Sequence, residues 1–512
     1  MELWRQFVAV AQDASRDTAG LALKIAVTGI ILVATIAWLR KSRAPRGTVL
    51  PPGPPGYPLI GLLLLGRKLL HPTFLKEWTA KYGPVLRLKV AFRNIIVLND
   101  FESIKEVMCM KELLHRTGNL VIDQTGCSGL LSLNGEVWNE NRRFCLHVLR
   151  DLGFGKKHME DWMKEEAKYL VKKIAERRGA PFVALDLLVP SASNNISALM
   201  FGARYPFEDS RRKFLDDRLK RLSKFVGNRS IGALLPVPVV RLAAKIPRIR
   251  DRLAGPVLED LLDFVKREIK EHEQTMDENS NRDFIDAYLK KIKQNKDNPN
   301  SSFTINHLIG NIFSLFVAGY ATVKETLQWH LIVCADKPDT VQRRIQEEID
   351  NIVGREREPS WADHNAMPFT MAFLWEMYRW RTVAPIGIPR IVGEDVVYKN
   401  LFLPKGTTVM ANLRGVHMSP KYWKDPEEFN PSRFLNEDGS VLLSKPDQLI
   451  PFGVGKRMCP GETMATVEIF LYLTTILQAF NVLPEEGQAI DLSSEKTGVN
   501  LAQNPKLRFV SR

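Results

Sequence analysis

The stretch Phe452-Gly453-Val454-Gly455-Lys456-Arg457-Met458-Cys459-Pro460-Gly461 decides the interpretation of this chain. It places a lone cysteine in a glycine-punctuated loop, two residues after an arginine. Glycine has no Cβ, so the first two glycines let the backbone approach a flat partner closely. Arg457 offers a permanent positive charge for a carboxylate. The apolar run at 462–480 predicts a buried helix, whose N-terminal end favours the thiolate form of Cys459.

The spacing Phe-x-x-Gly-x-Arg-x-Cys-x-Gly resembles the haem-binding loop of the cytochrome P-450 superfamily, the haem-thiolate monooxygenases. Every defining position is filled, by Phe452, Gly455, Arg457, Cys459 and Gly461. The resemblance implies that Cys459 is the axial thiolate of a haem b iron, and thiolate ligation favours O–O cleavage. Phe452 and Arg457 would then also bind the cofactor. An isolated cysteine is more often a buried structural residue, but this spacing favours the ligand.

The bulk composition is that of a globular protein, with 45% hydrophobic and 25% charged residues in 512. The cysteines are scattered and show no C-x-x-C spacing, which argues against a disulfide framework or a zinc site. The folded part is therefore expected to face a reducing compartment. The net charge of +14 favours acidic partners or an anionic membrane surface. No nucleic-acid module is visible in the sequence, so no nucleic-acid partner is expected.

The N-terminal region predicts a membrane anchor. Residues 25–39 read IAVTGIILVATIAWL, without charge or proline, and with residues 21–23 they approach the roughly 20 residues that span a bilayer. The basic residues at 40–46 follow at once, which keeps that flank cytosolic. A cleaved signal peptide would carry its basic residues before the apolar run. The prediction is a short lumenal N-terminus at 1–20 and a single transmembrane helix at 21–40, in the endoplasmic reticulum membrane.

A basic, proline-rich hinge is predicted at 41–58. The segment 51–58 reads PPGPPGYP, which cannot form a helix and should be stiff and extended. A ligand for a partner domain is the alternative, but the position after an anchor favours a hinge, as in microsomal members of the resembled family. The catalytic domain would then cover 59–512 and face the cytosol.

The rest of the chain predicts a mainly α fold with small β-sheets, in one large domain. Alternating apolar residues at 85–90 and 94–98 predict a hairpin. Helical periodicity with intervening charges predicts helices at 160–177, 257–274 and 340–353. A long proline-free run at 304–335 predicts a central helix capped by Thr304. The polar stretch at 277–300 is expected to be a surface loop.

The apolar segment 231–240 is too short to span a bilayer and is interrupted by prolines. Basic residues flank it on both sides. An apolar wedge with a cationic rim suits an interfacial membrane contact. A buried core loop is an equally good interpretation at this stage.

Glu376 and Arg379 lie three residues apart on a predicted helix and therefore share one face. An exposed pair of this kind is common and contributes little to stability. Arg433, in Pro431-Ser432-Arg433-Phe434, stands at the distance expected from the resembled family. The resemblance implies that Glu376, Arg379 and Arg433 form a buried structural network that locks the fold around the haem.

Trp138 and Arg142 lie four residues apart and also share a helical face. Ordinary core-and-surface patterning produces such pairs too. The resemblance implies that both donate to haem propionates, together with Arg390 and Arg457. An indole N–H and guanidinium groups are suitable donors for carboxylates.

The central helix contains Ala318-Gly319-Tyr320-Ala321-Thr322-Val323. The oxygen-activation motif of the resembled family is Ala/Gly-Gly-x-Asp/Glu-Thr-Thr/Ser, so the resemblance implies that Thr322 is catalytic. Ala321 and Val323 depart from that pattern. General acid catalysis requires a positioned proton donor, and alanine is not one. Glu325 lies one turn later and is the nearest acid.

These observations predict a membrane-bound monooxygenase that inserts one atom of O2 into a lipophilic substrate. The resemblance implies electrons from NADPH through a flavoprotein reductase, and substrate contacts at 116–134, 311–322, 383–388 and 497–501. The methyl group of Ala321 keeps open a haem-thiolate isomerase or dehydratase that rearranges a peroxide without a reductase. A haem-containing protein that only sequesters ligands is the second alternative. The retained Thr322 favours oxygen activation over both.

Overall fold

The computed structural model describes residue 29 and residues 44–57, 60–91, 93–116, 126–153, 157–226, 255–442, 444–493 and 504–512. Within these ranges the α-helices are α2 (Pro72–Tyr82), α3 (Phe101–Cys109), α4 (Gly135–Asp151), α5 (Lys157–Ala175), α6 (Leu185–Phe201), α7 (Ser210–Val226), α10 (Gly255–Thr275), α11 (Phe284–Gln294), α12 (Ile305–Asp336), α13 (Arg343–Ile352), α14 (Pro368–Trp380), α15 (Leu413–His417) and α16 (Glu462–Ala479). The strands are β1 (Val85–Val90), β2 (Arg93–Leu98), β3 (His115–Arg116), β4 (Phe182–Val183), β5 (Arg390–Ile391), β6 (Val396–Tyr398), β7 (Leu401–Leu403), β8 (Thr408–Ala411), β9 (Phe480–Pro484) and β10 (Lys506–Ser511). Short 3-10 or π turns are η1 (Leu63–Leu70), η2 (Lys111–Leu113), η5 (Pro338–Gln342), η6 (Trp361–Ala366), η7 (Pro431–Phe434) and η8 (Gly455–Arg457).

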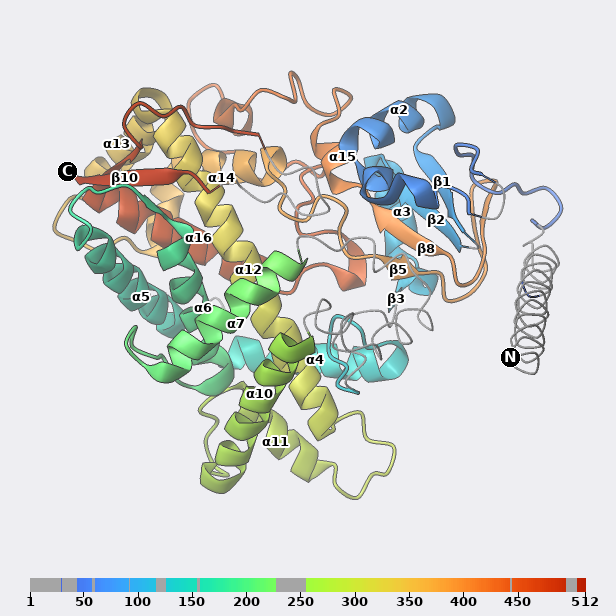
Figure 1. Ribbon diagram of the computed structural model, residues 1–512, viewed down its shortest axis with the longest axis horizontal. Helices are drawn as coiled ribbons and strands as arrows, with labels where there is room; N and C mark the ends of the chain where they lie inside the picture. The colour runs from blue at the N-terminus through green and yellow to red at the C-terminus, as the bar shows by residue number, and fades with distance from the viewer. Residues whose placement is uncertain are drawn as a thin grey trace, which may run out of the picture.

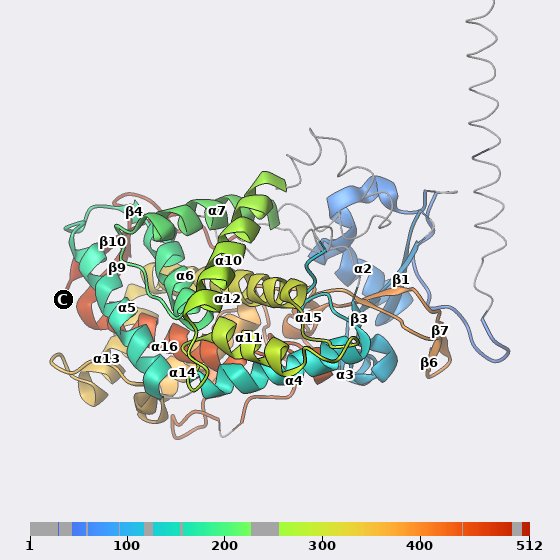
Figure 2. The same ribbon diagram turned by 90° about the horizontal axis from the view of Figure 1, so that it is seen from below.

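The helices form one body, and a strand-rich region with α2, α3 and α15 lies at its far side (Figure 1). Helix α12 crosses the middle of the helical body and packs against α6, α14 and α16. The second view shows the same division, with α5, α6 and α16 at one end and β1, β6 and β7 at the other (Figure 2). The fold is therefore mainly helical with small sheets, as predicted.

The predicted hairpin is confirmed. Strands β1 and β2 pair antiparallel from Val85↔Leu98 to Val90↔Arg93. Strand β8 then adds parallel to β2, and β5 and β3 complete a five-stranded sheet in the order β1-β2-β8-β5-β3. Because β5 carries Arg390 and β3 carries Arg116, this sheet brings two distant arginines into register as direct neighbours.

The central helix is also confirmed. Thr304 is its N-cap, and its side-chain oxygen accepts from the amide of His307 at 3.1 Å, which satisfies one of the unpaired N–H groups of the first turn. Most of its residues are buried. Gly319 lets α12 approach α6, since a Cβ there would lie 3.1 Å from the side chain of Ile196. The helices predicted at 160–177, 257–274 and 340–353 correspond to α5, α10 and η5 with α13.

The surface loop predicted at 277–300 is wrong in its middle, where α11 runs from Phe284 to Gln294. Asp283 caps this helix and accepts from the amide of Asp286 at 3.0 Å. The polar composition of the stretch belongs to the outer face, while Phe284, Ile285 and Tyr288 are buried against the body. The capping aspartate followed by an apolar pair was the sequence signal.

The described part of the predicted hinge is bonded to the strand-rich region. The amide of Val49 donates to the carbonyl of Asn400 at 2.9 Å, and the amide of Arg87 donates to the carbonyl of Pro52 at 2.8 Å. The predicted anchor falls outside the described residues except for residue 29. Among the residues that are described, no helix combines the length and the apolar character needed to cross a bilayer. The segment 231–240 also lies outside the described residues.

A buried histidine joins α10 to α11. His272 Nδ1 contacts the carbonyl oxygen of Glu268 at 2.6 Å, and Nε2 contacts Asp283 Oδ2 at 2.8 Å. Both partners are acceptors, so the arrangement suits a doubly protonated ring. Burial lowers the pKa of His272, but the hydrogen bond and charge of Asp283 outweigh it, and the pKa is raised.

We expect this clamp to weaken as pH rises. A raised histidine pKa gives stability that is complete below the unfolded value of about 6.5 and is lost as pH rises through the folded value. The free-energy difference between the native chain and His272→Gln should therefore shrink as pH rises above about 6.5. Urea or thermal unfolding of both proteins across that range measures it. A difference that stays constant or grows with pH would show that His272 is neutral in the fold.

Candidate functional site

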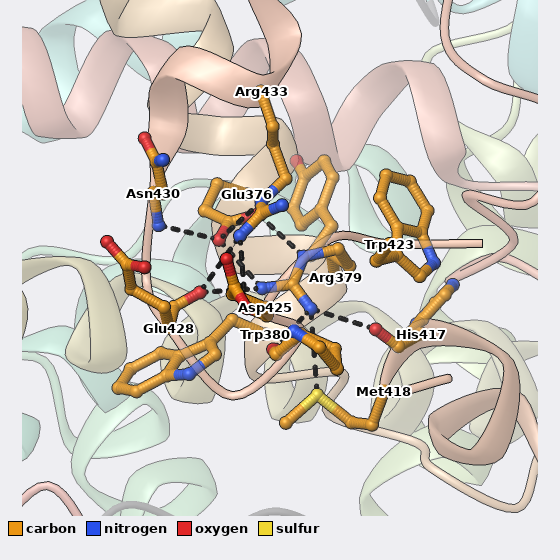
Figure 3. A network of polar contacts seen from close by, with 12 residues as sticks. Glu376, Arg379, Trp380, His417, Met418, Trp423, Asp425, Glu428, Asn430 and Arg433 are labelled. Atoms are coloured by element: carbon orange, nitrogen blue, oxygen red, sulfur yellow. Dashed lines mark hydrogen bonds and ion pairs between the residues drawn. The ribbon is translucent and has the colours of Figure 1, made fainter. Parts of the chain in front are cut away.

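The centre of the structural network is the carboxylate of Glu376 on α14, which is 0% exposed. Arg379 Nε and Nη2 donate to its two oxygens at 2.7 Å each, and Arg433 Nε donates at 3.2 Å (Figure 3). The amide of Asn430 adds a fourth donor at 2.8 Å. The structure thus brings together the three residues that the sequence predicted as a network.

The two arginines also bind the loop at 424–428 through its backbone. Arg379 donates to the carbonyl of Pro426 at 2.8 Å, and Arg433 donates to that of Lys424 at 2.8 Å. Both donate to the carbonyl of Glu428, at 3.1 and 3.2 Å. The buried carboxylate therefore orients two guanidiniums, and these hold a loop that has no regular structure of its own.

His417 links this network to the cysteine loop, and the sequence reasoning missed it. Arg379 donates to the carbonyl of His417 at 2.8 Å, and His417 Nε2 accepts from the amide of Ile450 at 2.9 Å. Its other nitrogen lies 2.6 Å from Thr382 Oγ1 and therefore carries the proton. Burial, with the nearby charges of Arg379 and Arg414, lowers the pKa of His417 to about 3, so the ring stays neutral at physiological pH.

The cysteine loop is closed by backbone bonds. The amide of Cys459 donates to the carbonyl of Phe452 at 2.8 Å, and the ring of Phe452 packs edge-on against Tyr378 of α14. Gly455 has φ of 71° and lies against α3, where a Cβ would come within 3.1 Å of Met108 O and Cys109 Sγ. Both the turn and this close approach require glycine.

Cys459 is exposed and lies three residues before Glu462, the first residue of α16. The amide of Gly461 donates to its sulfur at 3.4 Å. The surrounding protein partly desolvates the thiol, and this raises the pKa of Cys459. The bond from Gly461, at the N-terminal end of α16, favours the thiolate as expected, but together with the charge of Arg142 it offsets the desolvation only in part.

Four arginines surround the loop without an acidic partner. Among the residues that the structure describes, none of the four forms an ion pair with Asp or Glu, and all bind mainly backbone carbonyls: Arg116, Arg142, Arg390 and Arg457. Burial, followed by the charges of the other three, lowers the pKa of Arg457 to about 8. Like charges gathered in a partly buried site are unfavourable unless an anion compensates them.

Trp138 supplies the matching neutral donor. Its indole is 2% exposed, its Nε1 has no hydrogen-bond partner in the described structure, and the guanidinium of Arg457 stacks 3.7 Å from its ring centre. A buried N–H without an acceptor costs free energy unless a ligand satisfies it. An orphaned donor beside uncompensated cations fits a flat cofactor with two carboxylates, and a nearby exposed thiol fits the iron of haem. The residues present therefore fit haem.

The sequence analysis also missed Arg116 as a member of the arginine cluster. It expects Arg116 only at the start of a substrate-contacting segment. In the structure its guanidinium donates to the carbonyls of Ile388 and Pro389, and its Nε is buried without a partner. Burial, then the charges of Arg390 and Arg142, lowers its pKa to about 9. No local pattern marks it, because its neighbours come from β5 and α4.

The helix that carries Trp138 and Arg142 is held by Asn141, which is 0% exposed. Its Nδ2 donates to the carbonyl of Ser302 at 2.8 Å, and its Oδ1 accepts from Asn311 of α12 at 2.9 Å and from Tyr288 of α11. One side chain thus fixes α4 against both helices. Asn141, which lies between Trp138 and Arg142 in the sequence, therefore positions both predicted donors.

A glycine pair positions the loop that receives Arg457. Gly129 and Gly310 of α12 meet backbone to backbone, and a Cβ on either would clash. This contact presses the loop at 126–134 onto α12. The carbonyls of Leu130 and Leu133 in that loop then accept from Arg457.

Thr322 lies on an exposed patch of the otherwise buried α12, one turn after the exposed Ala318. Its hydroxyl donates to the carbonyl of Ala318 at 2.9 Å. Glu325 is buried, and Lys324 donates to its Oε1, while its Oε2 has no partner among the described residues. The nearest acid to Ala321 on this helix is thus already paired with a buried lysine.

The predicted substrate-contacting segments are described only in part. Residues 117–125 and 497–501 lie outside the described residues. Of the other two segments, α12 exposes Ala318 and Thr322, and the segment 383–388 exposes Ala384 and Ile388. Gly387 takes a positive φ of 61° in the second segment.

One further cluster has the residue types of a metal site, namely His272, Asp283 and Asp286. Asp283 caps α11 and Asp286 pairs with Arg282 at 2.6 Å. Each of the three side chains therefore already has partners inside the fold, and the cluster is structural.

Comparisons with known proteins find a matching family and similar chains. Residues 51–511 match the family described as Cytochrome P450. The chain is 36% identical over 443 residues to "Cytochrome P450 2C8" of Homo sapiens, covering 85% of this chain and 88% of the human protein. It is 33% identical over 510 residues to "Cytochrome P450 2H2" of Gallus gallus, covering 97% of this chain and 100% of the chicken protein.

Glu376→Gln should destabilise the protein strongly. The change leaves the buried guanidinium of Arg379 and the half-buried one of Arg433 without their counter-charge, and breaking a buried pair costs about 3–5 kcal/mol. The unfolding free energy and the haem content of the purified protein measure it. Glu347→Gln is the matched control, because Glu347 pairs with Arg343 at 2.8 Å with both side chains exposed and should cost about 1 kcal/mol or less. Equal losses in the two variants would contradict the buried network.

Trp138→Phe should keep the fold but loosen the cofactor. The native Nε1–H has no partner in the protein, so the polypeptide loses no internal hydrogen bond, whereas a lost hydrogen bond to a carboxylate should speed haem release about tenfold. Transfer of haem to an acceptor protein measures the rate. Trp423→Phe is the control, because that Nε1 donates to the carbonyl of Val416 at 3.2 Å. The control should lower stability, and equal haem release in native and Trp138→Phe proteins would remove Trp138 from the site.

Proposed function

The chain belongs to the cytochrome P450 family and is an oxidoreductase of the monooxygenase class, and we propose that it inserts one oxygen atom from O2 into a lipophilic substrate with electrons from NADPH. A flavoprotein reductase would deliver those electrons. One observation carries the proposal. The exposed thiol of Cys459 stands beside a cluster of cations that lacks acidic partners and an orphaned indole N–H. Such a site is complete only with a dianionic, iron-containing cofactor.

The residues around the cofactor divide into ligands and supports. Cys459 would ligate the iron, while Arg116, Arg142, Arg390, Arg457 and Trp138 would hold the carboxylates. Phe452 fixes the backbone of Cys459 through its carbonyl. Haem with a thiolate axial ligand supplies cleavage of the O–O bond. Glu376, Arg379 and Arg433 would act as positioning residues that reach the loop through His417.

Thr322 would hold and move a proton on the exposed patch of α12. Its hydroxyl donates to Ala318 O in the structure, and a hydroxyl can also accept, so it can relay. Ala321 offers no acid beside it. Burial and the bond to Lys324 hold Glu325 in place on the same helix.

We also propose that the chain is anchored in the endoplasmic reticulum membrane, with residues 1–20 lumenal, 21–40 spanning, 41–58 as hinge and 59–512 as the cytosolic catalytic domain. The apolar anchor sequence and its basic flank support this arrangement. Exposed apolar side chains also occur within the hinge, at Val49 and Tyr57, and just after it, at Ile60, Leu63 and Leu64. Exposed apolar side chains next to an anchor suit contact with membrane lipid.

One observation favours a second candidate function. The methyl group of Ala321 removes a proton donor that O2 activation uses, whereas rearrangement of a peroxide by a haem-thiolate isomerase requires neither an external proton supply nor a reductase. Dependence of turnover on NADPH and reductase separates the two. Turnover of a peroxide with neither present would favour the isomerase.

Cys459→Ser tests the proposed function directly. The reduced native protein with carbon monoxide should show the red-shifted Soret band of thiolate ligation, and the serine variant should lose that band and NADPH-dependent turnover. Cys109→Ser is the control, since Cys109 is also exposed and belongs to α3. A thiolate-type band in Cys459→Ser would contradict the assignment.

Ala321→Asp should raise the product formed per NADPH consumed. The native protein lacks the acid beside Thr322, so part of the reducing equivalents should leave as hydrogen peroxide. Parallel assays of product, NADPH and hydrogen peroxide measure this, and Thr322→Ala should worsen coupling. Ala321→Asn is the control, because it adds similar volume without an acid. Tight native coupling that Ala321→Asp leaves unchanged would show that another group, such as Glu325, supplies the proton.

A further inference from the structure

A buried carboxyl group joins α16 to α6, away from the residues that would hold the cofactor. Glu468 lies on α16 and is 2% exposed. Its Oε1 accepts from Nδ2 of Asn195, on α6, at 2.8 Å. In the described part of the chain this carboxyl has no other side-chain hydrogen bond and no ion pair. Its one partner is therefore a neutral amide.

The polar groups next to Glu468 donate towards a different carboxylate, that of Glu166 on α5. Asn195 donates to the hydroxyl of Tyr472 at 2.8 Å, and that hydroxyl lies 3.0 Å from Ser191 Oγ. Ser191 donates to Glu166 Oε1 at 3.1 Å. A serine has one proton, so Ser191 accepts from Tyr472. The donors thus run from Asn195 to Glu166 and leave Glu468 with a single one.

Glu166 also takes the nearby cations. Arg204 and Arg212 donate to its two oxygens at 3.1 and 2.9 Å. A buried carboxylate with one neutral donor is costly to ionise, and a second carboxylate nearby adds to that cost. Burial raises the pKa of Glu468 to about 8, the bond from Asn195 opposes this, and the charge of Glu166 adds to it.

The other ionisable side chains around these helices have partners of their own. Helix α7 faces the network with Arg212 and with Asp216, which accepts from Ser193 at 2.9 Å. The remaining elements packed on α16 carry the following groups: Lys324 with Glu325 and His330 with the carbonyl of Thr326 on α12, Glu348 of α13 with the amides of Phe369 and Thr370, His364 with the carbonyl of Trp361 in η6, and Tyr378 of α14 with Thr466. Among the described residues, none of these groups supplies a counter-charge to Glu468.

We propose that Glu468 is a neutral carboxylic acid in the folded protein and forms a pH-sensitive joint, at which ionisation of the carboxyl opens the contact between α16 and α6. The neutral acid brings a proton donor to a region where Asn195 Oδ1 is buried and has no donor. Both helices support the candidate site, since α16 begins three residues after Cys459, and Ile196 of α6 packs closely on Gly319. Opening would therefore loosen the packing behind the cysteine loop. The joint does not depend on the proposed reaction.

Infrared difference spectra of the full, haem-loaded chain detect the proton directly. The native protein minus Glu468→Gln should show the carbonyl stretch of a protonated carboxylic acid at neutral pH, and this band should disappear as pH rises through about 8. Glu347→Gln, which removes an exposed carboxylate paired with Arg343, should give no such band. Asn195→Leu removes the donor that favours the carboxylate, so the band should persist to higher pH. Absence of the acid band at neutral pH would overturn the proposal.

Urea unfolding and amide hydrogen exchange test the opening. The unfolded glutamate loses its proton near pH ~4.3 and the folded one near pH 8, so the stability that the neutral acid contributes is complete below the first value and is lost as pH rises to the second. Over that window the folding equilibrium constant of the native chain relative to Glu468→Gln should fall by up to about tenfold per pH unit.

Exchange of the α6 and α16 amides, corrected for the intrinsic effect of pH, should rise over the same window in the native protein and stay level in Glu468→Gln. Asn195→Leu keeps Glu468 and should show the rise as well, which secures the test if the glutamine variant does not fold. The same pH dependence in the native chain and Glu468→Gln would contradict the joint. So would an acid band that disappears without faster exchange in α6 and α16.

Discussion

The carboxylate of Glu376 is shared by two guanidiniums and has no contact with water, and the arrangement around the cysteine loop depends on it. Arg379 could not stay buried without this counter-charge, and the half-buried Arg433 shares it. Through them it fixes the carbonyls of the loop at 424–428, and through His417 it fixes the amide of Ile450, just before the cysteine loop. A charge on a helix therefore organises two segments that have little hydrogen bonding of their own.

Around the cysteine loop itself the charges are unbalanced, in contrast to the paired charges at Glu376. Arg116, Arg142, Arg390 and Arg457 are collected with their charges uncompensated, and the donor of Trp138 is left without an acceptor. A fold tolerates such a site only when the rest of the structure is stable enough to impose it. The network at Glu376 and the pinning of α4 by Asn141 provide that rigidity. The site is thus preorganised for an anionic partner, which is how a protein obtains affinity from charge without reorganisation.

Within two turns, helix α12 carries both a row of small residues and a buried ion pair. Small residues at 318, 319 and 321 keep one side open and let α6 approach, while Lys324 and Glu325 bring a buried ion pair into the same region. A buried pair contributes little net stability but is costly to break. The chain therefore retains an acid near Thr322, but one that is engaged with a lysine instead of standing free beside the hydroxyl. This departure, more than the haem site, distinguishes the chemistry expected of this chain.

The sequence by itself determined the features that depend on local spacing. The cysteine loop, the cap of α12 at Thr304, the hairpin of β1 and β2, and the i,i+3 and i,i+4 pairs of α14 and α4 all follow from residues close together in the chain, because turn and helix geometry fix which neighbours meet. The sequence analysis did not predict helix α11, because the polar residues of its outer face outnumber the few apolar residues of its buried face. Asp283, its N-cap, was the signal for its start. Tertiary structure alone decided that Arg116 joins Arg390 and that His417 reaches Ile450. Each of these contacts joins segments whose separation in the chain carries no period or spacing, so only the packing of sheet and helices brings them together.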